Sequence, residues 1–217
     1  MKITRPRVLV ACERSQVVAQ AFIAAGCDAY SADIELCLGG RPDRHIVGDV
    51  SPILDGHCLF TTQDGVSHQI RTSWDLVIAH PPCTYLSRVS SPHMFLADGN
   101  IDPIRAAYQV VAREFFLRCF RAAAPHVCVE NPIPQRRAAL PPPTTIVNPY
   151  EYGESWTKAT CLWLRNLPPL IPTLIATDTK SFVQTRRGSK ARSMFFPRVA
   201  KAMATQWSPI ILQHYEH

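Results

Sequence analysis

The sequence predicts an α/β fold in which a mostly parallel central sheet carries helices on both faces. Short apolar runs of strand length alternate with segments of helical periodicity, and this alternation is typical of parallel sheets. The chain has 217 residues, of which 47% are hydrophobic and 18% charged, so its composition is that of a globular protein and not of a disordered one. We expect a single domain over residues 1–217.

Short apolar runs predict the strands, because strands of a parallel sheet are buried on both faces. The first run, VLVAC, lies close to the N-terminus, and the fourth, DLVIA, is stopped soon afterwards by two prolines. The six predicted strands cover residues 8–12, 27–33, 45–50, 75–79, 126–131 and 160–164.

Helical spacing of apolar residues predicts three main helices. In the first helix Ser15 is a suitable N-cap and Gly26 marks the end, whereas Pro197 lies near the first turn of the last helix. The helices cover residues 15–25, 103–123 and 196–207.

Residues 57–73 depart from this alternation. Two short runs flank Asp64 and Gly65, which is a strong signal for a hairpin turn. We therefore expect a small hairpin insertion between two strands of the main sheet. The prolines of residues 132–143 predict an irregular loop.

Polar residues follow several of the predicted strands at the point where each strand ends. They are Asp33, Asp49, Cys83 and Glu130. Ligands bind at the carboxyl ends of strands in parallel sheets, so these side chains are expected to converge on one binding edge.

Cys83 is the most informative of these residues. Pro81 and Pro82 have fixed φ angles and lack amide donors, so they end the strand and hold Cys83 in a stiff turn. A thiolate is a strong nucleophile, which makes Cys83 a candidate for covalent catalysis.

The segments HPPCTYLS and VCVENP resemble, in order and spacing, the Pro-Pro-Cys and Glu-Asn motifs of DNA cytosine-5 methyltransferases. The resemblance implies a Rossmann-like methyltransferase fold and transfer of a methyl group to carbon 5 of cytosine. It implies that Cys83 attacks carbon 6 of the ring and that Glu130 protonates nitrogen 3. Burial at the end of an apolar strand is expected to raise the pKa of Glu130 and so help it to hold a proton.

Two further segments resemble the same family. In YGESWTKATCLWL, Lys158 is the cation that could hold the base or a phosphate, whereas the family usually has glutamine and two arginines there. FFPRVAKAMATQW resembles the final helix, which closes the cofactor pocket.

The resemblance implies S-adenosyl-L-methionine as the methyl donor. Asp33 is expected to bind its ribose, Asp49 to lie near its adenine amino group, and Glu13 to accept from its ammonium group. The turn ACERSQVV, however, has no glycine, whereas the family has a glycine-rich turn there. A second donor, methylene-tetrahydrofolate, therefore stays open and would give hydroxymethylcytosine. The candidate cofactor-binding residues are Cys12, Glu13, Ser15, Asp33, Ile34, Asp49, Val50, His80 and Pro82.

DNA is the expected partner, and its target cytosine would have to flip out of the helix. The formal net charge of +6 permits a nucleic-acid partner. Residues 165–195 stand where the family inserts its target-recognition region, here much reduced, and a free nucleotide substrate also stays open. The candidate DNA-binding residues are Ser87, Arg88, Arg186, Arg187, Lys190 and Arg192.

Cysteine usage and hydropathy bear on the compartment. The cysteines form no Cys-x-x-Cys pair, so we expect no metal site. No apolar run is long enough for a membrane span or a signal peptide, so we expect a cytoplasmic protein of a bacterium or a phage-infected host. An alternative of another class is an inactive DNA-binding protein with the same fold. An amino-group methyltransferase is disfavoured because His80 and Cys83 replace the residues which that family places around Pro-Pro.

Overall fold

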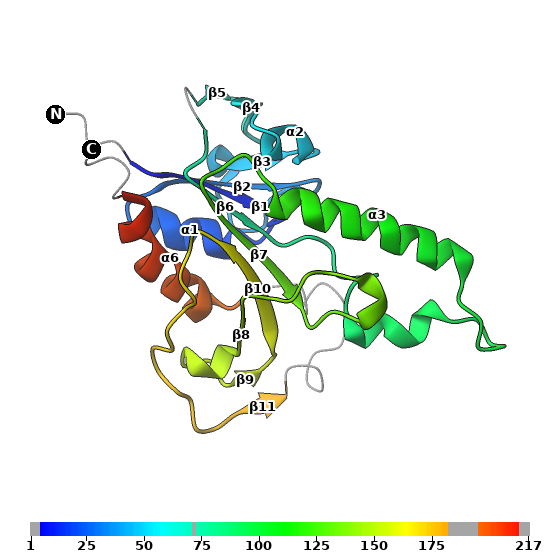
Figure 1. Ribbon diagram of the computed structural model, residues 1–217. Helices are drawn as coiled ribbons and strands as arrows, with labels where there is room; N and C mark the ends of the chain where they lie inside the picture. The colour runs from blue at the N-terminus through cyan, green and yellow to red at the C-terminus, as the bar shows by residue number, and fades with distance from the viewer. Residues whose placement is uncertain (1–4, 71–72, 182–194, 213–217) are drawn as a thin grey trace.

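A seven-stranded sheet forms the centre of the protein, in the order β3-β2-β1-β6-β7-β10-β8 (Figure 1). The computed structural model describes residues 5–70, 73–181 and 195–212. The strands of this sheet are β1 (Arg7–Ala11), β2 (Asp28–Asp33), β3 (His45–Val47), β6 (Leu76–Ala79), β7 (His126–Pro132), β8 (Thr145–Val147) and β10 (Thr160–Arg165). The predicted α/β fold with a mostly parallel central sheet is confirmed, and each of the six predicted strands is present.

Strand direction reverses at one edge of the sheet. β1, β2, β3, β6 and β7 pair in parallel, whereas β10 runs antiparallel between β7 and β8. Neither the reversal nor β8 was predicted from the sequence. β8 is an edge strand of three residues, too short for a clear periodic pattern, and strand direction leaves no mark on a local apolar run.

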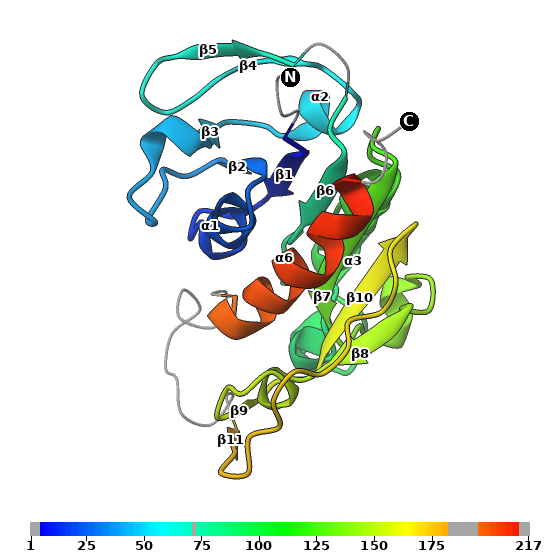
Figure 2. The same cartoon turned by 90° about the vertical axis from the view of Figure 1, so that its left-hand side faces the viewer.

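Helices cover both faces, as the alternating pattern predicts. α1 (Val17–Ala24) and α6 (Pro197–Leu212) lie side by side on one face, and α3 (Pro103–Phe120) covers the other (Figure 2). Val8 and Val10 pack on the side of α1 and α6, whereas Leu9 packs on the side of α3. The strands are therefore buried on both faces, which is why their sequences are apolar without alternation.

The start of α1 differs from the prediction that Ser15 caps this helix. Gln16 is the N-cap, with a φ of 61°. The carboxylate of Glu13 accepts hydrogen bonds from the amides of Val18 at 2.6 Å and Ala19 at 3.1 Å, and the Ser15 hydroxyl donates to Glu13 at 3.2 Å. Glu13 therefore supplies the acceptor that a helix N-terminus needs, because the preceding turn brings its side chain back under the helix.

The predicted hairpin is present as β4 (Leu59–Thr61) and β5 (Ser67–Gln69), joined through Asp64 and Gly65. The third predicted strand is shorter than expected and ends before Gly48, whose φ is 142°. Shorter elements complete the described part of the chain: η1 (Pro42–Arg44), α2 (Ser51–Leu54), η2 (Arg88–Met94), η3 (Arg136–Ala138), η4 (Pro149–Glu151), β9 (Trp156–Thr157) and β11 (Lys180–Ser181).

None of the helices in the described ranges combines the length and the apolar character that a membrane span requires. Among the same residues, no group of three or more His, Cys, Asp or Glu side chains is arranged to hold a metal ion.

Candidate active site

The register of the sheet places a row of polar side chains along the carboxyl edge. Ala11, Ala79 and Val129 stand side by side on β1, β6 and β7. The next residue on each strand is therefore at the same level of this edge: Cys12, His80 and Glu130. Asp33 extends the row, because Ala32 pairs with Ala11 on the other side of β1. The predicted convergence at one edge is thus present for Asp33 and Glu130.

Cys83 lies in a tight turn just beyond this edge. Pro81 is buried, and Cys83 itself is partly exposed. The carbonyl oxygen of Cys83 accepts hydrogen bonds from the amides of Leu86 and Ser87, both at 3.0 Å. The backbone of Cys83 is therefore held on both sides, by the prolines before it and by these two bonds after it.

The loop that carries Cys83 is joined to the loop that follows Glu130. The side-chain amide of Asn131 donates to the carbonyl oxygen of Pro81 at 2.9 Å, and both groups are buried. The backbone amide of Gln135 donates to Leu86, and that of Arg88 donates to Ile133, each at 2.8 Å. These bonds hold the Cys83 loop in place relative to β7. Sequence reasoning missed them, although the Asn after Glu130 was part of the motif.

His80 and Glu130 form a direct pair. Nδ1 of His80 lies 3.0 Å from Oε2 of Glu130, and each side chain is only 12% exposed. Ile78 and Cys128, two residues earlier on the two strands, pack on the side of α1 and α6. Because side chains alternate along a strand, His80 and Glu130 face the same side, where the Phe195 ring lies 5.0 Å from the His80 ring.

The pKa of Glu130 differs from the sequence-based expectation. Burial raises it, as expected, but the hydrogen bond and the charge of His80, with the charge of Lys158, outweigh burial and leave the pKa below its ordinary value. Glu130 is therefore ionised at neutral pH. The structure also brings Lys158 close enough to Glu130 to act on its charge, while its ammonium group lies 5.6 Å from the centre of the Phe196 ring.

The candidate cofactor residues lie at the ends of β1, β2 and β3. Burial raises the pKa of Cys12 to about 12, and the charges of Asp33 and Asp49 act on this thiol in the same direction. Asp33 accepts from the Glu35 amide at 3.0 Å, and Asp49 accepts from the Ser51 amide at 2.9 Å. Asp49 thus caps α2, and this bond lowers its pKa.

The remaining candidate residues of this group differ in exposure. Ile34 is 78% exposed, Pro82 is exposed, Ser15 is half-buried and Val50 is buried. An exposed isoleucine beside Asp33 offers an apolar surface at the edge, whereas Val50 contributes to the core beneath α2.

The candidate DNA-binding residues are only partly described. Arg88 is exposed, but Ser87 is buried and its hydroxyl pairs with that of Ser90 at 3.0 Å. Sequence reasoning missed Arg136 and Arg137, which are exposed in η3 and follow the loop to which Arg88 is hydrogen-bonded. The sequence signal was the Arg-Arg pair after the Glu-Asn motif. Arg186, Arg187, Lys190 and Arg192 lie outside the described residues.

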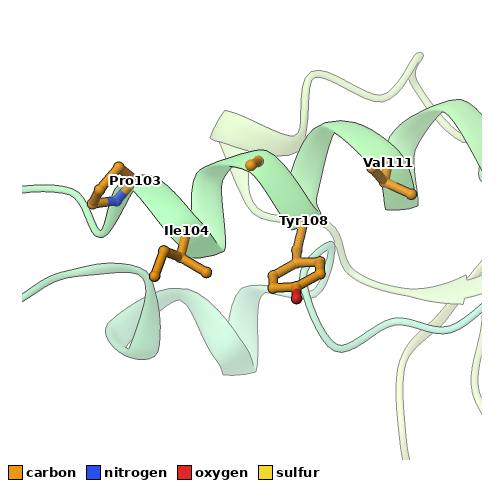
Figure 3. A pocket seen from close by; sticks show the side chains of 5 residues that line it. Pro103, Ile104, Tyr108 and Val111 are labelled. Carbon is orange, nitrogen blue, oxygen red and sulfur yellow. The ribbon is translucent and has the colours of Figure 1, made fainter.

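An open pocket of about 450 Å³ lies along the first turns of α3. Ile104 and Tyr108 project from one side of this helix, and Pro103, Ala107 and Val111 complete the lining (Figure 3). Tyr108 stacks on Tyr85 with ring centres 5.4 Å apart. Tyr108, which lines this pocket, therefore packs against the segment that follows Cys83.

Comparisons with known proteins show a similarity in structure. No family model matches the chain, and no curated protein is similar to it. Among solved structures, the chain is similar to a protein encoded within an E. coli prophage and inferred to be a DNA modification methyltransferase, with 15% sequence identity and a TM-score of 0.47. The match covers 79% of this chain and 52% of that one, so the chain spans about half the length of that protein. The α/β fold stated above rests on this protein's own sheet topology.

Proposed function

We propose that the protein transfers a methyl group to carbon 5 of cytosine in DNA through a covalent adduct with Cys83. The observation that carries the proposal is the junction of two loops. Cys83 lies on the loop after β6, Glu130 lies at the end of the adjacent strand β7, and the bond from Asn131 to Pro81 holds the two together. A nucleophile and a proton-transferring carboxyl group on adjacent, mutually fixed segments suit addition to an electron-poor ring.

The chemistry follows from the two side chains. The Cys83 thiolate forms a bond to carbon 6, and the electrons of the ring move through carbon 5 and carbon 4 to nitrogen 3. Nitrogen 3 takes a proton from the carboxyl group of Glu130. Carbon 5 becomes an enamine carbon and can accept the methyl group. Loss of hydrogen from carbon 5 to solvent then expels the Cys83 thiolate, and the proton on nitrogen 3 returns to Glu130.

The residues at the ends of β1 and β2 fit S-adenosyl-L-methionine, which when bound would supply the electrophilic methyl group. Asp33 places a carboxylate at the end of β2, where such groups bind ribose hydroxyls. The glycine-free turn still adopts left-handed backbone, with φ of 59° at Cys12 and 61° at Gln16. The turn thus reaches, without glycine, a conformation that glycine usually provides. Glu13 uses both carboxylate oxygens on α1, so a contact with the ammonium group would have to share these oxygens with the two amides.

DNA as the substrate is supported by exposed basic side chains beside the site. Arg88, Arg136 and Arg137 are exposed on the loops that flank Cys83 and Glu130. Guanidinium groups around such a site suit phosphates on either side of a flipped base. The basic segment at Arg186 and Arg187, which lies outside the described residues, is proposed to contact DNA phosphates as well.

Mass spectrometry of nucleosides from DNA treated with the protein tests this proposal. The wild-type protein with S-adenosyl-L-methionine is expected to produce 5-methylcytosine, and Cys83→Ala is expected to produce none. Cys58→Ala is the matched control, because Cys58 is also partly exposed but lies beside β4. If hydroxymethylcytosine forms, and only with a reduced folate, then the folate and not S-adenosyl-L-methionine is the one-carbon donor. If Cys83→Ala still forms product, the covalent route is excluded.

A further inference from the structure

His80 contacts one buried carboxyl group, and its charge acts on a second one. Its Nδ1 is 3.0 Å from Oε2 of Glu130. Burial raises the pKa of Glu13, and the charge of His80 is the leading influence in the opposite direction, so His80 also lies near Glu13. The backbone amide of His80 donates to the carbonyl oxygen of Ala11 at 3.0 Å, which fixes the residue between β1 and β7. His80 is thus held by its backbone and directed at Glu130 by its ring.

The ring is also shielded from solvent. His80 is 12% exposed, Phe195 packs against it, and Nε2 is buried with no hydrogen-bond partner among the described residues. A proton on Nδ1 therefore has one described acceptor, Oε2 of Glu130. Such a ring orients the carboxyl group and can exchange a proton with it.

The pair resolves a difficulty in the proposed chemistry. Glu130 is ionised at rest, because the effects of His80 and Lys158 outweigh burial. A carboxylate has no proton to give to nitrogen 3. The proton must reach it from a neighbouring group, and His80 is the neighbour in hydrogen-bond contact.

We propose that His80 is a positioning residue that orients Glu130 and supplies the proton that Glu130 passes to nitrogen 3 of the target ring. This inference rests on the proposed function. As the Cys83–C6 bond forms, Oε2 takes the Nδ1 proton from the imidazolium, leaving a neutral ring. The carboxyl group then passes one proton to nitrogen 3 and returns to its ionised form. The proton follows the reverse route when the adduct breaks down, so no proton is gained or lost over the cycle at His80.

His80→Asn separates proton supply from orientation. The Asn amide nitrogen can occupy the position of Nδ1 and donate to Glu130, but it cannot release a proton at neutral pH. His68→Asn is the matched control, because His68 is a partly buried histidine of the hairpin, hydrogen-bonded to Thr62 at 3.0 Å. Glu130→Gln and the double variant that combines His80→Asn with Glu130→Gln complete the set.

The experiment measures single-turnover methylation of cytosine-containing DNA from pH 6 to pH 9 for these proteins. His80→Asn is expected to lower the rate by about 10²-fold, within the range that general acid catalysis supplies. The double variant is expected to be no slower than Glu130→Gln, because His80 acts through Glu130. The wild-type rate is expected to change with pH over this range, and His80→Asn is expected to lack that part of the change, because an amide cannot release a proton. Glu130 and Glu13 are the charged groups that interact with His80, and the charge of Lys158 acts on Glu130.

A wild-type rate and pH profile in His80→Asn, or additive losses in the double variant, would overturn the inference. Nuclear magnetic resonance of histidine-labelled protein keeps it testable if His80→Asn does not fold. Glu130→Gln is expected to shift the ring-nitrogen signals of one histidine, and an unchanged set of histidine signals would exclude the pair. If the wild-type protein is inactive but this shift is present, the proposed function is rejected, whereas the interaction between His80 and Glu130 is supported.

Discussion

The side-chain amide of Asn131 donates a buried hydrogen bond of 2.9 Å to the carbonyl oxygen of Pro81, and this bond joins the loop of the candidate nucleophile to the strand of the candidate acid. Pro81 precedes Cys83 by two residues, and Asn131 follows Glu130 directly. The bond therefore sets the relative position of two side chains that are 47 positions apart in the chain numbering, from 83 to 130. Turnover is expected to depend on this bond as well as on the two side chains themselves.

Asn131→Ala is expected to lower turnover by about 10²-fold, because removal of the bond lets the Cys83 loop move and small misplacements are costly in catalysis. The free energy of unfolding is expected to fall by about 1–3 kcal/mol, since the buried Pro81 carbonyl loses its partner. Rate and urea unfolding are measured together. Asn166→Gly is the control: Asn166 donates a similar bond of 2.8 Å to Pro125, away from the site, and glycine tolerates its φ of 55°. Equal reductions of rate in both variants would contradict a local role.

Glu13→Ala is expected to lower the free energy of unfolding by about 2 kcal/mol, because the amides of Val18 and Ala19 lose their acceptor. Thermal and urea unfolding check this. Glu35→Ala is the control, since Glu35 is exposed and its surface ion pair with Arg14 contributes about 1 kcal/mol or less. A Glu13→Ala protein as stable as Glu35→Ala would remove the capping role.

The same residue predicts a pH dependence of stability. Burial raises the pKa of Glu13 above its ordinary value of 4.5, so the folded protein binds this proton more tightly than the unfolded chain does. The contribution of Glu13 to stability is therefore expected to decline as the pH rises from 4.5 through the raised pKa. Glu13→Ala is expected to flatten this part of the stability profile, and a profile identical to that of the wild type would contradict the assignment.

Cys12 is expected to resist alkylation by iodoacetamide at neutral pH, because burial and the charges of Asp33 and Asp49 raise its pKa to about 12. Cys37, which is partly exposed on the loop after β2, serves as the internal reference. Peptide mass spectrometry measures the rate at each cysteine. Labelling of Cys12 as fast as Cys37 would show that the thiolate of Cys12 is accessible.

Asp33→Ala is expected to weaken binding of S-adenosylhomocysteine by about 10- to 100-fold, which corresponds to the removal of hydrogen bonds to a charged acceptor. Isothermal titration calorimetry measures this affinity, and DNA binding is expected to stay unchanged. Asp28→Ala is the control, because Asp28 lies at the opposite end of the same strand. If Asp33→Ala binds S-adenosylhomocysteine with unchanged affinity, the ribose of the cofactor does not bind at Asp33.

Charge reversal at Arg186 and Arg187 is expected to weaken DNA binding on every sequence alike. The slope of log affinity against log salt is expected to fall by roughly 0.9 for each phosphate that the protein no longer neutralises. Arg136→Glu with Arg137→Glu is expected to have a similar effect. Arg121→Glu is the control, since Arg121 is exposed where α3 ends, before β7 begins. If the salt dependence of DNA binding in these variants equals that of the control, the arginines are ordinary solvated residues that do not contact DNA.

Much of the sheet could be predicted from the sequence because its strands are continuous apolar runs between clear stop signals. β1, β2, β6, β7 and β10 each fall within two residues of the predicted range at either end. The edge strand β8 could not be predicted in this way, because its three residues are too few to show a strand pattern beside the prolines that precede them.

Local chemistry along the chain also identified Cys83 and Glu130, since two prolines before a thiol and an acid after an apolar run are visible in the sequence. The partners of these residues depend on the register between strands, and only the tertiary structure decided them. Alignment of Ala79 with Val129 brings His80 against Glu130, and this contact lowers a pKa that burial alone would raise. The helix cap of α1 was decided in the same way: a turn with left-handed backbone at Cys12 and Gln16 carries Glu13 under the helix, where Ser15 was expected. Apolar periodicity indicates which residues are buried. The pairing of polar side chains depends on distances between segments that are far apart in the sequence, and local patterns do not determine these distances.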